Sequence, residues 1–376
     1  MSTDFNQVVN DCMNAINDKI KNLKQLNIIV AGKTGVGKST LINSVFREEL
    51  AETGIGKPIT KHMQKLSKPE FPLNIYDTKG LEMSSEVQNE VKKEIIQTIK
   101  DGVYSKDPNK AIHCIWYCIN TSSDRIEDNE IEWLRSFTEE NRETKVPVII
   151  VLTKSFSIKK AEEFRNYIDS LNLEVEQIVI VLAKDYEIDD NYVVKSYGTD
   201  KLVQVMGDVL DKELHATLQN VQKASIAQKV KYAHGIVVTT VAASFAEGFS
   251  PIPFSDAALL IPTQVTMIAS ITAVFGLEIN KSIITAFISS ALGTSSLTIA
   301  GKTIAANLLK LVPGAGTILG GVISGSTAAV LTTALGEAYI KLLESICKGE
   351  LKESDIGSEG AKEKLKNFFK QEMKKG

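Results

Sequence analysis

The sequence predicts an α/β domain with a mostly parallel, doubly wound sheet, joined to an all-α hydrophobic helical domain. Short apolar runs alternate with helical segments in the first half of the chain, and a glycine-rich loop follows the first run. Long segments almost without charge fill much of the second half. We divide the 376 residues into an amphipathic helix at 1–24, the α/β domain at 25–220, the helical domain at 221–348 and a lysine-rich tail at 349–376.

Five runs rich in apolar and β-branched residues predict the strands of the sheet. They occupy residues 26–32, 72–78, 111–119, 146–153 and 177–183. Segments with helical spacing separate them, for example at 128–140 and 160–171, and the short run 62–66 is a candidate edge strand. Strands that alternate with helices indicate parallel pairing, with crossover helices on both faces.

The loop "GKTGVGKS" after the first strand fits the pattern G-x-x-x-x-G-K-[ST]. Its glycines let backbone N–H groups turn toward phosphate oxygens, and the helix that begins near Lys38 directs its positive end at the same charge. The strand before and the helix after favour this interpretation over a turn without a ligand. We predict that Lys38 reaches the β- and γ-phosphates and that Ser39 binds Mg²⁺. The predicted nucleotide contacts here are Gly32, Lys33, Thr34, Gly35, Val36, Gly37, Lys38, Ser39 and Thr40.

Asp77 ends the second predicted strand, and Gly80 follows it by three residues. A carboxylate beside a phosphate loop can hold Mg²⁺, and a glycine N–H can contact a γ-phosphate. In the preceding polar loop, Thr60 is our choice to complete the Mg²⁺ shell, with Thr53 and an ordinary turn threonine as alternatives. The predicted catalytic residues are Lys38, Thr60 and Gly80, and the predicted metal ligands are Ser39, Thr60 and Asp77.

Two later strands end in "TKSF" and "LAK", which place Thr153 and Lys154, then Ala183 and Lys184, near the expected base. With these, the order of "GKTGVGKS", Thr60, "DTKG", "TKSF" and "LAK" resembles the five motifs of GTPases of the translation-factor-related (TRAFAC) P-loop class over about residues 26–219. The resemblance implies GTP or GDP with Mg²⁺ as cofactors, and hydrolysis of GTP as the activity.

Two positions depart from the pattern of that class. Phe156 stands where the motif [NT]-K-x-D has an aspartate that accepts hydrogen bonds from guanine N1 and N2, so ATP is an alternative to GTP. Leu81 stands where small GTPases have a glutamine that orients water, so we expect slow hydrolysis unless another residue or a second subunit supplies this group. Arg125 is a candidate donor, although a solvated loop arginine is the simpler interpretation.

The apolar second region has two interpretations. The segments 257–277 and 311–336 are long enough to cross a bilayer. Their Ser, Thr and Gly content, and Pro262, which is expected to break or kink a helix, favour a helical bundle instead. The glycine pairs 316/320 and 321/325 suit close helix packing in either setting. A bundle would pack in part on the apolar face of the amphipathic helix near the amino terminus.

The same region resembles a bacterial domain-of-unknown-function family found behind GTPase domains. The resemblance rests on P-I-P at 251–253, the nearby Asp256 and P-G-x-G at 313–316. A helix before the GTPase domain and a helical domain after it also give a layout similar to the immunity-related and dynamin-like GTPases. The tail 361–376 suits either a basic amphipathic helix on an anionic membrane or, more simply, a solvated terminal helix.

Composition and isolated residues exclude several other functions. The 43 basic and 46 acidic side chains nearly cancel, so no nucleic-acid partner is indicated. The cysteines lack zinc-binding spacing and are expected to be buried reduced thiols, and His113 in an apolar strand is expected to be a core side chain. The start of the sequence lacks the pattern of a secretory signal, so we expect a cytoplasmic protein, with peripheral or integral membrane association left open.

These features lead to a main hypothesis and an alternative. The first is a slow GTPase, active as a homodimer or larger self-association, whose nucleotide state controls how the helical domain docks or contacts a membrane surface. The alternative is a nucleotide-gated binding module with negligible turnover that recruits a protein partner.

Overall fold

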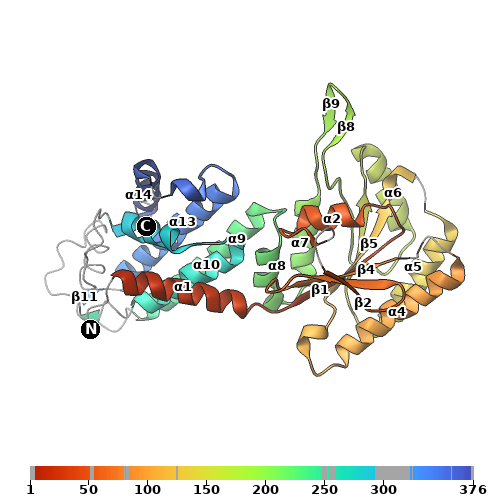
Figure 1. Cartoon of the computed structure of the whole chain (residues 1–376), viewed down its shortest axis with the longest axis horizontal. Coiled ribbons are helices and arrows are strands. Elements are labelled where there is room, and N and C mark those ends of the chain that lie inside the picture. Colours follow the sequence, from red (N-terminus) through yellow and green to blue (C-terminus); the bar gives the residue numbers. More distant parts are fainter. Residues whose placement is uncertain are drawn as a thin grey trace. The chain divides into compact units, whose positions relative to one another are not determined.

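The chain folds into two compact units, which are described separately. The computed structural model describes residues 5–50, 55–79, 81, 84–123, 126–247, 252–253, 260–292, 322–323, 325–356 and 358–373. The sheet unit is the continuous segment Leu23–Ser225, and the helical unit combines Met1–Asn22 with Ile226–Gly376 (Figure 1). The helical unit therefore begins before the sheet unit and is completed after it.

A seven-stranded sheet forms the centre of the sheet unit, in the order β2-β3-β4-β1-β5-β6-β7. Its central strand β1 pairs in parallel with both β4 and β5, and β5, β6 and β7 continue the parallel arrangement. The strands β3 and β2 add to β4 in antiparallel fashion. The mostly parallel sheet predicted from the sequence is confirmed. The strands are β1 (Leu26–Ala31), β2 (Ile55–Pro58), β3 (Met63–Ser67), β4 (Leu73–Thr78), β5 (Cys114–Asn120), β6 (Val148–Thr153) and β7 (Gln177–Ile180).

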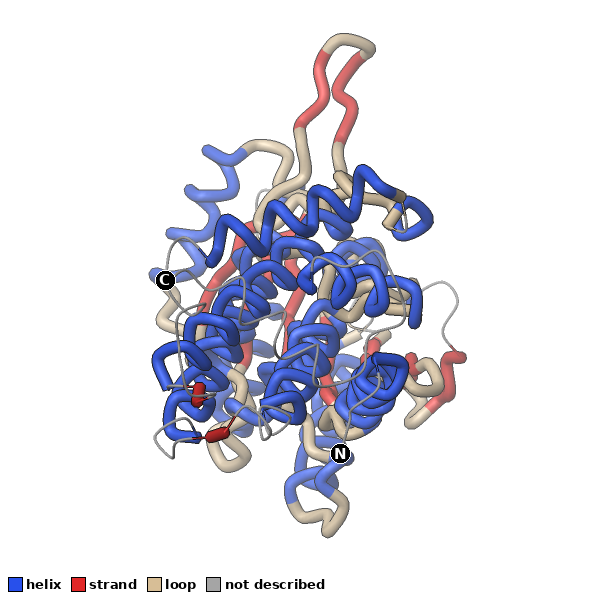
Figure 2. The backbone as a smooth tube through the Cα atoms, turned by 90° about the vertical axis from the view of Figure 1, so that its left-hand side faces the viewer, coloured by secondary structure: helices blue, strands red, loops and turns tan. Residues whose placement is uncertain are grey.

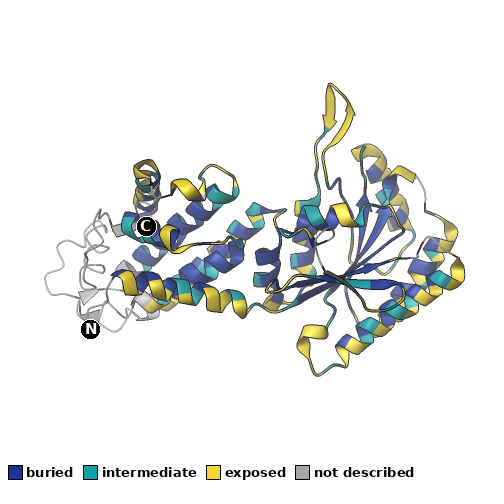
Figure 3. Cartoon of the chain, viewed as in Figure 1, coloured by how far each residue is buried: buried dark blue, intermediate teal, exposed yellow. Residues whose placement is uncertain are grey.

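Helices cover both faces of this sheet. On one face α2, α7 and α8 bury apolar side chains, and on the other α4, α5 and α6 do so. Both faces of the central strands are therefore dry, which explains their nearly continuous apolar sequences (Figure 3). The helices are α2 (Lys38–Val45), α4 (Ser85–Val103), α5 (Asp128–Asn141), α6 (Ile158–Ser170), α7 (Thr199–Val209) and α8 (His215–Val221).

Three strand assignments differ from the sequence analysis, and one of them is β2, which was not predicted. The run at 62–66 is not an edge strand, because β3 lies between β4 and β2, and β2 forms the edge. In addition, β8 (Tyr186–Asp189) and β9 (Tyr192–Val194) form an antiparallel hairpin that the sequence analysis did not predict. This hairpin projects from the sheet unit, and most of its residues are exposed (Figures 1 and 2).

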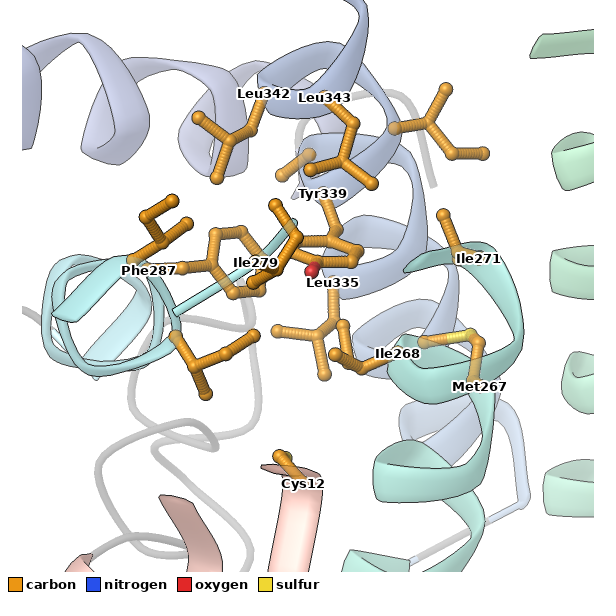
Figure 4. Packing of buried hydrophobic residues seen from close by; sticks show 14 of the residues in the cluster. Cys12, Met267, Ile268, Ile271, Ile279, Phe287, Leu335, Tyr339, Leu342 and Leu343 are labelled. Atoms are coloured by element: carbon orange, nitrogen blue, oxygen red, sulfur yellow. The ribbon is translucent and has the colours of Figure 1, made fainter. Parts of the chain in front are cut away.

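The helical unit is built from six described helices around one apolar core. Its core includes Met267 and Ile271 of α10, Phe287 of α11, and Tyr339 and Leu343 of α13 (Figure 4). The helices are α1 (Phe5–Lys21), α9 (Ile226–Glu247), α10 (Leu260–Phe275), α11 (Lys281–Leu292), α13 (Gly325–Cys347) and α14 (Glu359–Met373). Short strands β10 (Ile252–Pro253) and β11 (Val322–Ile323) pair antiparallel.

Both terminal helices belong to this core. The predicted amphipathic helix is α1, and it buries Phe5, Val9 and Ile16 in the helical unit. The helix of the lysine-rich tail is α14, which buries Leu365 and Phe369 in the same core rather than being solvated on all sides. Burial of one apolar side chain of this size contributes about 1.5–3 kcal/mol, so both helices are firmly docked.

Pro262 does not break a helix, contrary to the sequence expectation. It lies in the first turn of α10, which begins at Leu260, and there the missing N–H would have had no intrahelical partner. Among the described residues, no helix has the length and apolarity needed to cross a bilayer. The glycines at 316, 320 and 321, and the P-G-x-G stretch at 313–316, lie outside the described residues.

Candidate functional site

The predicted phosphate loop connects β1 to α2, and its glycines have backbone conformations that suit this turn. Gly32 has a φ of +141° and packs so closely that an added Cβ would lie 2.5 Å from the carbonyl oxygen of Cys118. Gly35 and Gly37 have φ values of +77° and +102°, in the region that favours glycine. The loop therefore requires glycine at these positions for geometric reasons that do not depend on a ligand.

Lys38 is the first residue of α2, as predicted, and its ammonium turns back onto the loop. The Nζ atom donates to the carbonyl oxygens of Gly32 (2.7 Å) and Lys33 (3.1 Å). Ser39 and Thr40 follow it and are exposed. The lysine thus lies inside the curve of the loop, within reach of any anion bound there.

Asp77 is the penultimate residue of β4 and pairs with Val30 near the end of β1, so its carboxylate lies on the same edge of the sheet as the phosphate loop. Its Oδ2 accepts a hydrogen bond from Gln64 (3.1 Å), whereas Oδ1 is buried and has no partner among the described residues. Burial raises the pKa of Asp77, and the nearby Lys38 ammonium opposes this rise. Burial of a carboxylate oxygen without a hydrogen-bond donor costs free energy, and such an oxygen is well suited to coordinate a cation.

Lys33 lies in the phosphate loop, but its side chain points away to α5. Its ammonium lies 2.8 Å from carboxylate oxygens of Glu127 and Glu130, and Glu130 also accepts a hydrogen bond from Tyr117 (3.0 Å). Partial burial acts to lower the pKa of Lys33, but the two carboxylates outweigh it and raise this pKa. A hollow of about 360 Å³ lies here, lined in part by Thr34. A nucleotide contact from Lys33 would therefore come from its backbone.

The loop between β2 and β3 carries Thr60, and in this structure its hydroxyl donates to Glu94 of α4. The same carboxylate accepts from the backbone N–H of His62 (3.1 Å) and lies 3.1 Å from the Nδ1 atom of this histidine. Thr60 is therefore attached to α4, and its role as a metal ligand stays a prediction. The predictions for Gly80, Thr53 and Arg125 fall outside the described residues.

Leu81 is buried, and its backbone carbonyl takes part in a polar contact. That oxygen accepts a hydrogen bond from Nε2 of Gln88 (2.9 Å) in α4. The side chain offers no polar atom that could orient a water molecule.

Thr153 is the last residue of β6, Lys154 follows it, and both lie against the phosphate loop. The Thr153 hydroxyl is 2.6 Å from the carbonyl oxygen of Val36 and 3.1 Å from that of Ile119. Lys154 has a φ of +53°, and a Cβ added to Gly37 would lie 3.9 Å from Cγ and Cε of Lys154. The predicted base-binding loop and the phosphate loop are thus held together by direct contacts.

Ala183 and Lys184 follow β7, and they lead into the β8–β9 hairpin. Ala183 is half-buried and Lys184 is exposed. Phe156, at the position of the missing aspartate, places its ring centroid 4.0 Å from that of Tyr186 in the hairpin. The sequence analysis missed this pair, although the alternation in "YEIDDNYVV" around Asp-Asn is a hairpin signal.

The opposite edge of the sheet carries a different polar cluster. The buried Asn27 side chain donates to the carbonyl oxygens of Asn109 (2.8 Å) and Ala111 (2.7 Å), and it accepts from Asn74 (2.7 Å). The backbone N–H of Asn27 donates to Nδ1 of His113 (3.0 Å), and burial lowers the pKa of this histidine. His113 is therefore a half-buried side chain with a partner, just before β5, rather than a fully buried core residue.

The cysteines also match their predicted state. All four are free, with Cys12, Cys114 and Cys118 buried and Cys347 half-buried. Burial raises the pKa of both Cys12 and Cys118 to about 12. In the part of the chain that the structure describes, no group of three or more His, Cys, Asp or Glu side chains is arranged to hold a metal ion.

The sheet order, the glycine loop before α2, and the residues Lys38, Asp77 and Thr153 on one edge together define a P-loop GTPase. The comparison with known families agrees, because the AIG1 family matches residues 26–234, more than half of the chain. The chain belongs to the AIG1 family. A domain of unknown function, DUF697, matches residues 207–375. Both resemblances inferred from the sequence are thereby confirmed.

Individual relatives are distant. Septin-12 of Bos taurus is 22% identical over 202 residues, which cover 46% of this chain and 54% of the septin. Magnetosome membrane protein 22 of Magnetospirillum gryphiswaldense is 28% identical over 144 residues, which cover 38% of this chain and 70% of that protein. The chain spans about half the length of the first curated relatives that it matches.

Solved structures of GTPases are similar over about half of the chain. The structure of a probable GTP-binding protein, engB, is 21% identical with a TM-score of 0.31. The match covers 49% of this chain and 97% of the engB chain. A structure of the chloroplast translocon components atToc33 and psToc159, whose title says that dimerization is important for their GTPase activity, is 18% identical with a TM-score of 0.34. It covers 53% of this chain and 89% of its own.

Proposed function

We propose that this chain binds GTP with Mg²⁺ at the carboxyl edge of its sheet, hydrolyses it slowly as a single copy, and is accelerated by self-association. We further propose that the nucleotide state changes the loops around Thr60 and Gly80, and thereby the docking of the helical unit to a partner or a membrane surface. The observation that carries the proposal is the buried, unpartnered Oδ1 of Asp77 on the sheet edge of the Lys38 loop.

The donor set fits a magnesium nucleotide. Mg²⁺ would be held by Ser39 and Asp77, with Thr60 as a third candidate, and would neutralise charge on the phosphate oxygens. Lys38 would exchange its bonds to the carbonyl oxygens of Gly32 and Lys33 for phosphate oxygens. The ammonium needs little movement for this exchange, because it already lies inside the loop.

The slow rate follows from Leu81. Orientation of the attacking water needs a polar side chain, and the buried Leu81 supplies none. A second copy could supply the missing group, and such assistance would make the rate per chain depend on protein concentration. Negligible turnover at every concentration would favour the nucleotide-gated binding module instead.

The conformational part of the proposal rests on Glu94. Its carboxylate holds the Thr60 hydroxyl and the His62 backbone N–H, so Thr60 must leave Glu94 before it can bind a metal ion. The two positions of Thr60 exclude each other, which is the requirement for a two-state element biased by a ligand. The name of the magnetosome membrane relative supports membrane contact as one outcome of that change.

The test is the rate of GTP turnover per chain, measured over a wide range of protein concentrations. We expect the rate per chain to rise with concentration, and Lys38→Ala to abolish turnover. Flotation of the full chain with anionic vesicles, in the presence of GDP or of a non-hydrolysable GTP analogue, tests the docking step. A concentration-independent rate would contradict assistance by self-association, and identical flotation with both nucleotides would contradict nucleotide-controlled membrane contact.

A further inference from the structure

The loop after β6 is fixed against the phosphate loop, so its next residues meet the base of any nucleotide bound there. Thr153 holds the carbonyl oxygen of Val36, and the stem of Lys154 lies along Gly37. Phe156 comes two residues later and is half-buried. The inference below rests on the proposed binding of a nucleotide at this edge, and it concerns how the base is recognised.

Phe156 does not stand alone, because Tyr186 of the β8–β9 hairpin packs against it. The two ring centroids lie 4.0 Å apart with an angle of 38° between the ring planes. Tyr186 retains 43% of its accessible surface, so much of its ring is free to meet a ligand. An aromatic surface of this kind binds purine bases by stacking, irrespective of their hydrogen-bonding groups.

The hairpin is tied to the base-binding loop at its root. The Tyr197 hydroxyl donates to the carbonyl oxygen of Ser155 (2.7 Å), and Tyr197 also forms a β-bridge with Leu182. Asp185, just before β8, lies 2.8 Å from both the Lys195 ammonium and the Ser196 backbone N–H. These bonds close the hairpin around the base-binding loop, so Tyr186 is held in place despite its exposure.

The bonds of Asp185 also affect base recognition. This carboxylate lies closest in sequence to the Phe156–Tyr186 pair, and both of its oxygens are already bound within the hairpin root. A base at this edge therefore meets aromatic carbon at the position where an aspartate would accept from guanine N1 and N2.

We propose that Phe156 and Tyr186 form an aromatic wall that binds the purine ring by contact, and that Tyr186 is a specificity-determining residue supplied by the hairpin. The site then selects purine nucleotides, but it does not read the 2-amino group of guanine. Strong discrimination by a binding site requires a polar group that would be left unpaired with the wrong ligand, and the ring faces of Phe156 and Tyr186 carry no such group.

The test compares GTP with inosine triphosphate, which lacks only the 2-amino group, and with ATP. Each nucleotide competes with a fluorescent GTP analogue for the full-length protein in the presence of Mg²⁺. We expect the affinities for GTP and inosine triphosphate to agree within about threefold. A preference for GTP of a hundredfold or more would overturn the proposal.

Three variants locate the effect. Tyr186→Ala should weaken all three purine nucleotides by about tenfold without changing their order, because stacking on any purine is lost. Tyr192→Ala removes a tyrosine from the other strand of the same hairpin, which is 60% exposed, and should leave all affinities unchanged. Phe156→Asp should raise the preference for GTP over inosine triphosphate by about tenfold, because it restores an acceptor. Equal effects of Tyr186→Ala and Tyr192→Ala would overturn the proposal.

Failure of this inference can be distinguished from failure of the proposed function. If the GTP turnover rate per chain does not change with protein concentration while the three affinities follow the expected pattern, self-assisted hydrolysis is contradicted and the aromatic wall is supported. If Lys38→Ala binds the analogue as tightly as the unmodified chain, the nucleotide lies elsewhere, and both proposals are overturned.

Discussion

The central sheet has an amino edge, where its parallel strands begin, and a carboxyl edge, where they end. The two edges differ in how their buried polar groups are hydrogen-bonded. At the amino edge, the side chain of Asn27 makes three hydrogen bonds, and its backbone N–H makes a fourth. At the carboxyl edge, Oδ1 of Asp77 and Oγ1 of Thr78 are buried without a partner among the described residues. Since almost all buried polar groups in proteins are paired, this difference supports the proposed ligand site at the carboxyl edge.

The largest effect is expected from a substitution at the carboxyl edge. Lys38→Ala should lower nucleotide affinity by more than about a hundredfold, because the ammonium that meets the phosphates is lost. The stability of the fold should fall modestly, because the variant loses the bonds to two loop carbonyls and the charge that opposes the rise in the pKa of Asp77. Titration with a fluorescent GTP analogue measures the affinity, and urea unfolding measures the stability.

The matched control for Lys38 is Lys79→Ala. Lys79 follows Thr78 on the same edge and is exposed, and its ammonium makes a long contact of 3.4 Å with Gln64. We expect its replacement to change the affinity by less than about threefold. Equal losses for the two lysines would mean that the general positive charge of this edge, rather than the Lys38 ammonium, binds the nucleotide.

The next largest effect is expected from a substitution at the amino edge. Asn27→Leu leaves Asn74 and two carbonyl oxygens without their partner, and should lower the free energy of unfolding by about 3 kcal/mol. Nucleotide affinity of the folded protein should be unchanged, because the phosphate loop lies at the other end of β1. Urea unfolding tests the first expectation, with Asn166→Leu on the exposed side of α6 as the control. A loss below about 1 kcal/mol would show that the network contributes little.

A smaller effect concerns how stability depends on pH, which should differ between variants of two carboxylates. Burial raises the pKa of Asp77 above 3.8, so its ionised form destabilises the ligand-free fold. The stability gained through protonation is present below pH 3.8 and is lost as the pH rises through the raised pKa. The side chain at position 77 cannot ionise in the Asp77→Asn variant, so the variant does not lose stability in this way. The difference in unfolding free energy, variant minus unmodified chain, should therefore increase as the pH rises above 3.8.

For Asp185→Asn, the difference in unfolding free energy, variant minus unmodified chain, should instead decrease as the pH rises toward 3.8. The hydrogen bond from Lys195, together with those from Ser196, lowers the pKa of Asp185 to about 2, so its stabilising contribution is present above pH 3.8 and is lost as the pH falls toward 2. Urea unfolding of both variants across this pH range measures the two slopes. Parallel slopes for the two variants would contradict the assignment of Asp77 as an uncompensated buried carboxylate.

The smallest expected effect concerns the other lysine of the phosphate loop. Lys33→Met should change nucleotide affinity by less than about threefold, because its ammonium binds Glu127 and Glu130 and only its backbone faces the phosphates. The same titration as for Lys38→Ala measures it. A loss comparable to that of Lys38→Ala would show that the Lys33 side chain leaves α5 and binds the nucleotide.

Much of the carboxyl edge was predictable, because its residues follow strands in a fixed order. The five predicted strands and the positions of Lys38, Asp77 and Thr153 follow from local patterns, since the ends of parallel strands meet at one edge. The amino edge was not predictable. Asn27 and Asn74 face each other only through the register of β1 with β4, and a single sequence carries no signal for that register.

The hairpin and the loop of Thr60 show two further limits. The β8–β9 hairpin has a readable alternation, but its exposed apolar residues resemble no buried strand. Thr60 was assigned from its place before a strand, and its contact with Glu94 depends on how α4 packs beside β3. A sequence gives the composition of such a loop, whereas the partner of each side chain is set by tertiary packing.

The divided helical unit has a consequence for biosynthesis. Its first helix, α1, leaves the ribosome before the 203 residues of Leu23–Ser225 and before every other helix of its own core. At roughly 5–20 residues per second, the sheet unit alone takes about 10–40 s to make, and α10 and α13 are made only after it. The sheet unit can fold in that interval, while α1 remains a natural target for a chaperone. Assembly of the helical core therefore follows synthesis of the sheet unit.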